Sequence, residues 1–194
     1  MINEKKNNIT VYCASSTSVD EKYFEAARQL GTEIARRGAT LVSGAGSMGL
    51  MGAVNDAAIA AGGKTIGVIP RFMVERNWHH KNLGQLIVTD GMHSRKEMMA
   101  ELSTGVIALP GGIGTFEELL EIITWRQLGL YEGNIVILNV AGYYNHLLEM
   151  LSHAIDEKFM KPDHRELWVV AHTAEEAVDA ALSKNEHNKF SAKF

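Results

Sequence analysis

The chain of 194 residues has one cysteine, no run of basic residues and no long apolar segment. Cys13 has no second cysteine for an internal disulfide, and its apolar neighbours predict a buried small hydrophobe. A net charge of −4 without a basic patch argues against a nucleic-acid duplex as the main partner. No apolar run approaches the roughly 18 residues that span a bilayer, and residues 1–8 lack the apolar core of a signal peptide. These absences predict a soluble, cytoplasmic protein that binds neither nucleic acid nor membrane.

Motifs for metal-dependent and serine-nucleophile chemistry are also absent. The chain has no HExxH motif and no paired Cys/His spacing, so we expect no metal site. It has no G-x-S-x-G turn, which excludes the usual arrangement of a nucleophilic serine. What the chain does have is an ordinary apolar fraction of 46% and enough length for one α/β domain with a substantial core.

Short apolar runs alternate with longer helical patterns along the chain. The expected strands are 9–14, 39–43, 65–69, 85–89, 105–109, 135–139 and 167–171. The expected helices are 20–37, 49–61, 92–102, 116–130, 143–157 and 174–183. This order predicts an α/β, Rossmann-like, doubly wound and mostly parallel sheet with helices on both faces. We expect one nucleotide-binding domain over residues 1–194, with frayed ends at 1–7 and 184–194.

The helix expected at 116–130 is apolar over most of its circumference. Such width indicates burial on more than one side. We therefore expect it to cover one face of the sheet and also a second subunit.

Residues 110–118, with the sequence PGGIGTFEE, are the most informative stretch. They join the apolar run 105–109 to a helix, and a glycine-rich turn in that position leaves backbone N–H groups free to bind an anion such as phosphate. Glu117 and Glu118 follow, and adjacent helical residues point about 100° apart, which predicts different roles for them. Thr115 and Glu118 also match a capping box, which is a structural alternative for Glu118.

Two further segments with candidate binding residues lie at the carboxyl ends of expected strands. Residues 44–49, GAGSMG, match the dinucleotide fingerprint, but the next strand ends in Pro70-Arg71 without the acid that holds a ribose hydroxyl. A tight packing turn and a nucleotide contact both remain open there. Residues 92–96, MHSRK, place two cations in the first turn of a helix, at the positive end of its dipole. They form either a solvated basic pair or part of an anion site.

Together these segments resemble the "Lonely Guy" cytokinin riboside 5′-monophosphate phosphoribohydrolases, a family often labelled lysine decarboxylases. Residues 110–118 match its PGGxGTxxE motif, 46–52 its GxxGLMG turn and 92–96 its MHxRK segment. The run 124–129 is also similar, and the resemblance covers about residues 9–181. It implies a Rossmann-like homodimer without a dinucleotide. It also implies hydrolysis of the N-glycosidic bond of a nucleoside 5′-monophosphate, which releases an adenine-type base and ribose 5-phosphate.

By this resemblance Arg95 and Glu118 are the catalytic pair. The substrate-binding residues that it implies are Gly46, Ser47, Met92, Arg95, Lys96, Gly111, Gly112, Ile113, Gly114, Thr115, Glu117 and Thr124, with the 5′-phosphate on residues 111–115. A carboxylate suits the oxocarbenium-like state of glycoside cleavage, because it can stabilise the positive ribose and orient or deprotonate water. Arg95 stays charged in proteins, so it polarises the leaving base or clamps the phosphate. No metal or redox cofactor is needed.

The chain departs from the family pattern at three positions. Ala14 and Ala45 replace common glycines, and Asn77 falls where relatives carry a substrate-binding glutamate. These changes bear on substrate preference more than on fold or reaction. Two other hypotheses stay open from the sequence: a non-catalytic, regulatory nucleotide-binding module, and an NADP-linked oxidoreductase built on residues 44–49 and Arg71.

Overall fold

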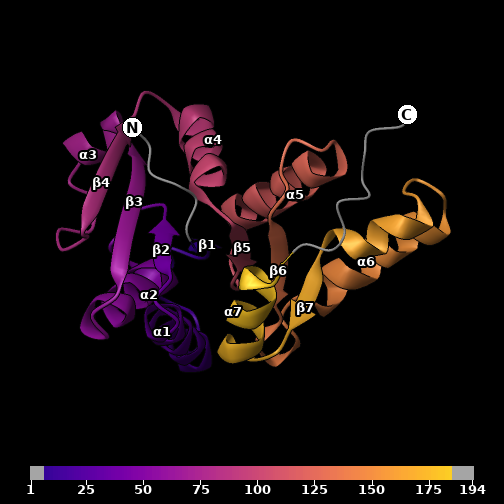
Figure 1. Ribbon diagram of the computed structural model, residues 1–194, viewed down its shortest axis with the longest axis horizontal. Helices are drawn as coiled ribbons and strands as arrows, with labels where there is room; N and C mark the ends of the chain where they lie inside the picture. Colours follow the sequence, from indigo (N-terminus) through magenta and orange to yellow (C-terminus); the bar gives the residue numbers. More distant parts are fainter. Residues whose placement is uncertain (1–6, 185–194) are drawn as a thin grey trace.

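A single seven-stranded sheet organises the computed structural model, which describes residues 7–184 (Figure 1). Its strands are β1 (Asn8–Tyr12), β2 (Thr40–Ser43), β3 (Lys64–Pro70), β4 (Gln85–Thr89), β5 (Gly105–Ala108), β6 (Asn134–Leu138) and β7 (Val169–Ala171). The helices are α1 (Glu21–Arg36), α2 (Gly49–Ala60), α3 (Arg71–Glu75), α4 (Met92–Leu102), α5 (Ile113–Gln127), α6 (Asn145–Asp156) and α7 (Ala174–Leu182). Two 3₁₀ turns, η1 (Val140–Gly142) and η2 (Pro162–Leu167), complete the described part.

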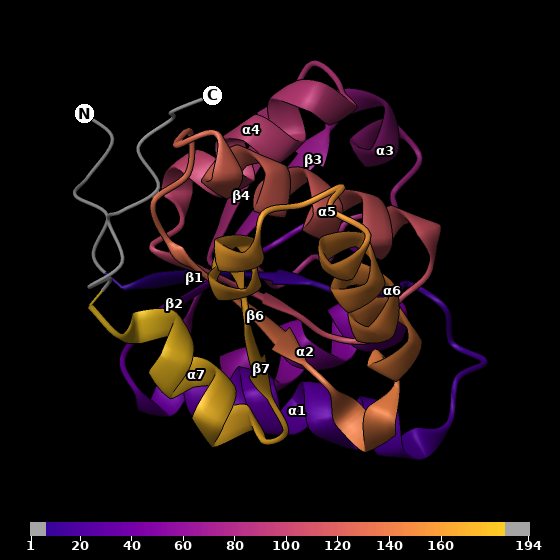
Figure 2. The ribbon, with the colours of Figure 1, turned by 90° about the vertical axis from the view of Figure 1, so that its right-hand side faces the viewer.

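The strands lie in the order β4-β3-β2-β1-β5-β6-β7, and every neighbouring pair is parallel. Helices α1, α2 and α7 cover one face, while α4, α5 and α6 lie on the other (Figure 2). Successive strand residues enter opposite cores: Val11 of β1 packs with the first group of helices and Tyr12 with the second. The predicted doubly wound α/β fold is confirmed.

The centre of the sheet holds the switch in winding direction. The chain builds β2, β3 and β4 on one side of β1 and then returns to place β5 on its other side. The segments that follow these two central strands are joined, because the Ala14 N–H donates to the Pro110 carbonyl at 3.2 Å. Folds of this kind bind ligands beyond the carboxyl ends of the strands at the switch point. All the glycine-rich and charged turns singled out in the sequence open at this edge.

The expected element ends are less accurate than the elements themselves. Helix α3 was not expected, since five residues are too few to show a helical period. Helix α5 begins at Ile113 rather than at residue 116, because the glycines before Phe116 form its first turn. It ends at Gln127 rather than 130, where Gly129 adopts a φ of 73° and the Leu130 N–H donates back to the Trp125 carbonyl.

The helix expected at 143–157 and the strand expected at 167–171 also begin late. Helix α6 starts at Asn145 rather than 143, because Ala141 and Gly142 have φ values of 50° and 74° and form a turn. Strand β7 starts at Val169, after residues 162–167 close a 3₁₀ turn. No helix within residues 7–184 is long and apolar enough to cross a membrane. The expected frayed ends lie almost wholly outside the described residues, and the single-domain assignment stays a prediction.

Candidate active site

The loop between β5 and α5 presents an open helix N-terminus at the switch point. Gly112 is the N-cap of α5, and no side chain caps the first turn. The first N–H groups of a helix have no partner within the helix, so those of this turn are available to an anion. A Cβ added at Gly112 or Gly114 would meet no atom within 4 Å. The backbone at these two positions therefore faces open space that a ligand can approach closely.

Thr115 does not cap helix α5, and the capping-box assignment of Thr115 and Glu118 is wrong. Thr115 lies inside the helix and is buried, with its side chain against the position that a Cβ on Gly111 would occupy, 2.0 Å from Thr115 Oγ1. Because α5 begins at Ile113, Glu118 falls in its second turn and is not tied to the N-terminus. This removes the structural alternative that the sequence offered for the Glu118 carboxylate.

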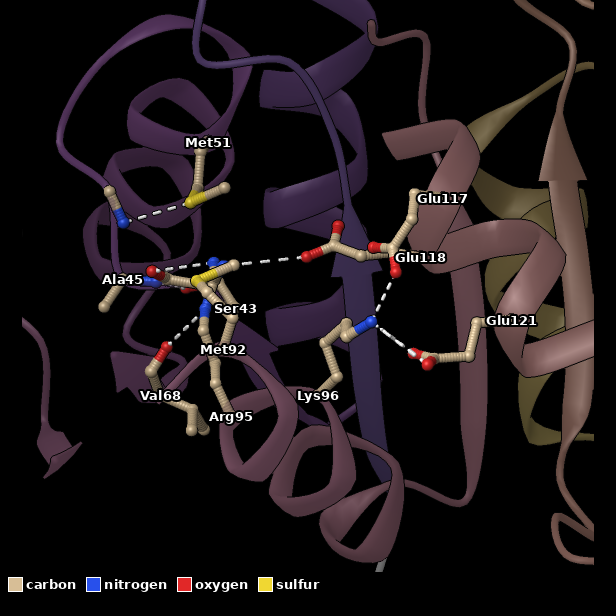
Figure 3. A network of polar contacts seen from close by, with 12 residues as sticks. Ser43, Ala45, Met51, Val68, Met92, Arg95, Lys96, Glu117, Glu118 and Glu121 are labelled. Atoms are coloured by element: carbon tan, nitrogen blue, oxygen red, sulfur yellow. Dashed lines mark hydrogen bonds and ion pairs between the residues drawn. The ribbon is translucent and has the colours of Figure 1, made fainter. Parts of the chain in front are cut away.

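Arg95 projects from α4 into the space beneath the turn that follows β2. It is 5% exposed, and its guanidinium is fixed by two backbone carbonyls. Nε donates to Val68 O at 3.1 Å and Nη2 to Gly44 O at 3.2 Å. A Cβ on Gly44 would lie 1.7 Å from Arg95 Nη2, so only glycine lets the turn and the guanidinium approach this closely. Figure 3 shows the guanidinium lying between the turn and α5.

Glu118 of α5 faces Arg95 across the site. Its Oε1 lies 3.7 Å from Arg95 Nη1, and both side chains are at least nine-tenths buried (Figure 3). Burial raises the pKa of Glu118 to about 7, although the positive charge of Arg95 opposes the rise. A carboxyl that titrates near neutral pH can exchange a proton with a reacting group, which is what a general base or acid requires.

Lys96 lies beside Arg95 on α4 but pairs with different carboxylates. Its Nζ donates to Glu117 and, at 3.0 Å, to Glu121, which joins α4 to α5 (Figure 3). Burial lowers the pKa of Lys96, but the hydrogen bonds that Lys96 donates to these two carboxylates outweigh it and raise that pKa overall. The interpretation of Arg95 and Lys96 as a solvated pair is wrong, since both are buried. Glu117 and Glu118 thus have different partners, and the different roles predicted for them stay a prediction.

Comparison with known proteins decides the family. The family described as "Possible lysine decarboxylase" matches residues 51–181. Two Arabidopsis thaliana proteins, cytokinin riboside 5′-monophosphate phosphoribohydrolases LOG5 and LOG1, are 43% and 44% identical over 92% and 91% of this chain, and over 78% and 83% of their own lengths. The chain belongs to this family of phosphoribohydrolases. The resemblance drawn from the three sequence motifs is thereby confirmed.

Solved structures confirm the fold independently. The molybdenum cofactor carrier protein from Chlamydomonas reinhardtii matches with a TM-score of 0.70 at 24% identity, over 90% of this chain and 95% of that chain. A second solved structure, titled TM1055, also reaches a TM-score of 0.70, at 21% identity. Likeness at these identities shows a shared architecture and says nothing of shared ligands.

The turn after β2 is constrained by backbone conformation and close packing as well as by its contacts with Arg95. Gly49 has a φ of 62°, and a Cβ there would lie 2.4 Å from the Ser15 carbonyl carbon. The Gly46 N–H is directed at Met51 Sδ, 3.0 Å away. Ala45, one of the departures from the family, also adopts a left-handed φ, of 61°, which glycine reaches without strain. Gly49 therefore serves close packing against the loop after β1, while a nucleotide contact by residues 44–49 stays a prediction.

The structure brings most of the expected substrate-binding residues to one edge, with one exception. These residues follow the carboxyl ends of three strands: Gly46 and Ser47 follow β2, Met92 follows β4, and residues 111–115 follow β5. Thr124 lies six residues beyond Glu118 on α5, roughly 9 Å along the axis, and its exposed hydroxyl donates to the Leu120 carbonyl of its own helix. The substrate-binding roles, including that of Thr124, stay predictions.

The sequence did not predict the contacts that two residues of the site make. Gly44 was grouped with the fingerprint, and only the structure shows that its missing Cβ makes room for Arg95. Tyr143 lies after β6, far along the chain, yet its hydroxyl donates to the Gly111 carbonyl at 2.6 Å. Within residues 7–184 no group of three or more His, Cys, Asp or Glu side chains is arranged to hold a metal ion.

Proposed function

We propose that this protein hydrolyses the N-glycosidic bond of a nucleoside 5′-monophosphate, giving a free adenine-type base and ribose 5-phosphate. The single observation that carries this proposal is the buried pair of Arg95 and Glu118, 3.7 Å apart, beside the uncapped N-terminus of α5. The names of its relatives in Arabidopsis, cytokinin riboside 5′-monophosphate phosphoribohydrolases, support the same reaction and favour cytokinin nucleotides among the substrates.

The 5′-phosphate would bind the free N–H groups of the first turn of α5, where the helix dipole also favours an anion. This anchors the ribose over Glu118, one turn further along the same helix. Binding energy from such a non-reacting group orients the bond that breaks. The phosphate loop and the catalytic carboxylate thus act together because one helix holds both.

Glu118 stabilises the positive charge that develops on the ribose as the bond breaks. In its ionised form it also accepts a proton from the water that attacks C1′. The electrons of the C1′–N bond pass to the base, which takes up a proton as it leaves. Arg95 keeps its charge, polarises the leaving base and holds Glu118 in place. Substrate and one water are thereby converted to base and ribose 5-phosphate.

The test is to incubate the pure protein with AMP and with isopentenyladenosine monophosphate and to measure the released base by chromatography. We expect release by the wild type and a loss of about 10²–10³-fold in rate for Glu118→Gln. The rate should rise as the pH passes through about 7, because the ionised carboxylate is the active form. Nucleotide binding without release would instead support a regulatory module, and binding of NADPH but not AMP would support an oxidoreductase.

The assembly and setting of the protein belong to the proposal as well. We expect a homodimer, supported by exposed apolar side chains on α5 and just after it: Leu120 is 40%, Leu128 37% and Leu130 72% exposed. A soluble protein does not often leave such side chains grouped in water. A cytoplasmic location, the absence of a nucleic-acid partner and independence from cofactors stay predictions.

A further inference from the structure

The carbonyl groups of the loop between β5 and α5 all accept hydrogen bonds, three from other parts of the protein and one from helix α5 itself. Four consecutive oxygens, from Leu109 to Gly112, each accept a hydrogen bond. The donors are Tyr144 Oη to Leu109 at 2.7 Å, Ala14 N to Pro110 at 3.2 Å, Tyr143 Oη to Gly111 at 2.6 Å and Phe116 N to Gly112 at 3.0 Å. With every oxygen turned toward the protein, the N–H groups of the loop are turned the other way.

The Gly111–Gly112 peptide is the part of this loop with the greatest freedom. Glycine on both sides removes the restrictions that a Cβ would place on rotation of the peptide plane. Proline at position 110 fixes the backbone before it, and helix α5 fixes the backbone after it. Within residues 7–184, the hydrogen bond to the Gly111 oxygen comes from the Tyr143 hydroxyl. Because a trans peptide holds C=O and N–H in opposite directions, that bond also aims the Gly112 N–H.

The Tyr143 ring is itself held firmly. Its centroid lies 5.8 Å from that of Tyr23, 6.4 Å from that of Phe116 and 5.1 Å from that of Tyr144. The turn that carries it is closed by Asn139, whose Oδ1 accepts the Tyr144 N–H at 2.8 Å. Tyr143 is nevertheless 37% exposed, so it lies at the surface of the site and not in the core.

We propose that Tyr143 is a positioning residue for the phosphate. Its hydroxyl locks the Gly111–Gly112 peptide so that the Gly112 N–H joins those of the first turn of α5 in facing a 5′-phosphate. The inference rests on the proposed function only in taking the ligand of this loop to be a phosphate. Loss of the hydroxyl should weaken binding of the phosphorylated ligand and leave binding of the unphosphorylated one unchanged.

Tyr144 provides a matched control within the same turn. Its hydroxyl makes the same kind of bond, to the carbonyl of Leu109, but it is 1% exposed and its acceptor lies at the end of β5. Pro110 and the hydrogen bond from Ala14 separate that acceptor from the glycines. Tyr144→Phe should therefore reduce thermal stability without changing the preference for a phosphate.

The experiment measures dissociation constants for AMP and adenosine by calorimetry, in the Glu118→Gln background, whose slow turnover leaves the ligand largely intact during the titration. Adding Tyr143→Phe should raise the dissociation constant for AMP about 5- to 10-fold, the worth of one hydrogen bond, and change that for adenosine less than about twofold. Adding Tyr144→Phe should leave the ratio of the two constants unchanged. In the otherwise wild-type enzyme, Tyr143→Phe should raise KM for AMP with little change in kcat.

Three results would overturn the inference: an unchanged constant for AMP in Tyr143→Phe, an equal loss for AMP and adenosine, or no preference for AMP before the change. The failure of the proposed function looks different. In that case the wild type releases no base from any nucleotide, while the ratio of the two dissociation constants still reports on Tyr143. The melting temperature of each variant shows whether the fold is kept.

Discussion

Glu118 is the residue at which stability and function oppose each other. Its burial raises the pKa to about 7 from 4.5, so the folded protein prefers the neutral acid. A carboxyl whose folded pKa exceeds its unfolded value stabilises the fold below pH 4.5, and this contribution is lost as the pH rises to 7. Above pH 7 the charged form costs roughly 3 kcal/mol relative to an unshifted carboxyl. The protein keeps a carboxylate where a neutral side chain would be more stable.

Glu118→Gln should therefore unfold at a higher temperature than the wild type at pH 8, with the difference shrinking toward pH 4.5. Glutamine has nearly the same shape and no charge to desolvate, which is why the gain depends on pH. Thermal denaturation at several pH values measures it. Glu101→Gln, which changes an exposed carboxylate of α4, is the control and should show no such trend. A variant that is less stable than the wild type at pH 8 would contradict the argument.

At the scale of single residues, the sequence predicted which residues belong to the candidate site but not which contacts they make. Arg95 and Glu118 were named from motifs, and the structure places them face to face. Their burial was not predicted, because Lys, Arg and Glu are usually exposed and nothing local marks an exception. Tyr143 was missed for a related reason: its partner Gly111 is 32 residues earlier, and no local pattern reports a contact of that range.

At the scale of elements, the site depends on how closely α4 approaches the turn after β2. The contact between Gly44 and Arg95 ties the two together, since the Gly44 carbonyl accepts from the guanidinium and its missing Cβ makes room for it. The pair of Lys96 with Glu117 and Glu121 ties α4 to α5 on the other side. Arg95 and Glu118 are thus held by three segments, α4, α5 and the turn after β2, whose spacing is set by the sheet.

Gly44→Ala should displace Arg95 and reduce base release by about 10²-fold, the usual effect of misplacing a catalytic group by about 1 Å. The added Cβ would lie 1.7 Å from Arg95 Nη2, so the side chain must move. Gly91→Ala is the matched control: a Cβ there meets no atom within 4 Å, and its φ of −157° suits alanine. Equal activity of both variants in the chromatographic assay would contradict the claim that Gly44 makes room for a functional Arg95.

The elements themselves were predicted well, because buried parallel strands are continuous apolar runs and helices are amphipathic. All seven strands and the six long helices were expected within a few residues of where they lie. The predicted start of α5, three residues too late, was the error that most affected the description of the site. Glycine has low helix propensity, so residues 112–114 gave no helical signal, although Ile113 and Gly114 begin α5, where we propose that the phosphate binds.

At the scale of the molecule, the fold concentrates function at one edge of the sheet and leaves an apolar surface elsewhere. The winding switch between β1 and β5 brings the loop 110–115 beside the turn that follows β1. Leu128 and Leu130, at the far end of α5, remain exposed. Helix α5 therefore connects the edge where we propose that catalysis occurs to the surface where we expect a second copy of the chain.

Leu130→Glu should convert a dimer to a monomer, because a charge would be buried where an apolar side chain packs. Sedimentation velocity at several concentrations gives the state of assembly. Phe159→Glu is the control, since Phe159 is also highly exposed, at 87%, but follows α6 instead of α5. A wild type that sediments as a monomer, or a dimer unaffected by Leu130→Glu, would remove α5 from the interface.

The most direct test of the central claim is a full product analysis of AMP treated with the wild type, Glu118→Gln and Glu121→Gln. Glu121 lies one turn beyond Glu118 on α5 and pairs with Lys96 instead of Arg95. We predict adenine and ribose 5-phosphate in equal amounts from the wild type and from Glu121→Gln, and neither product at a comparable rate from Glu118→Gln. Adenosine and inorganic phosphate as products, or unchanged release by Glu118→Gln, would contradict the account.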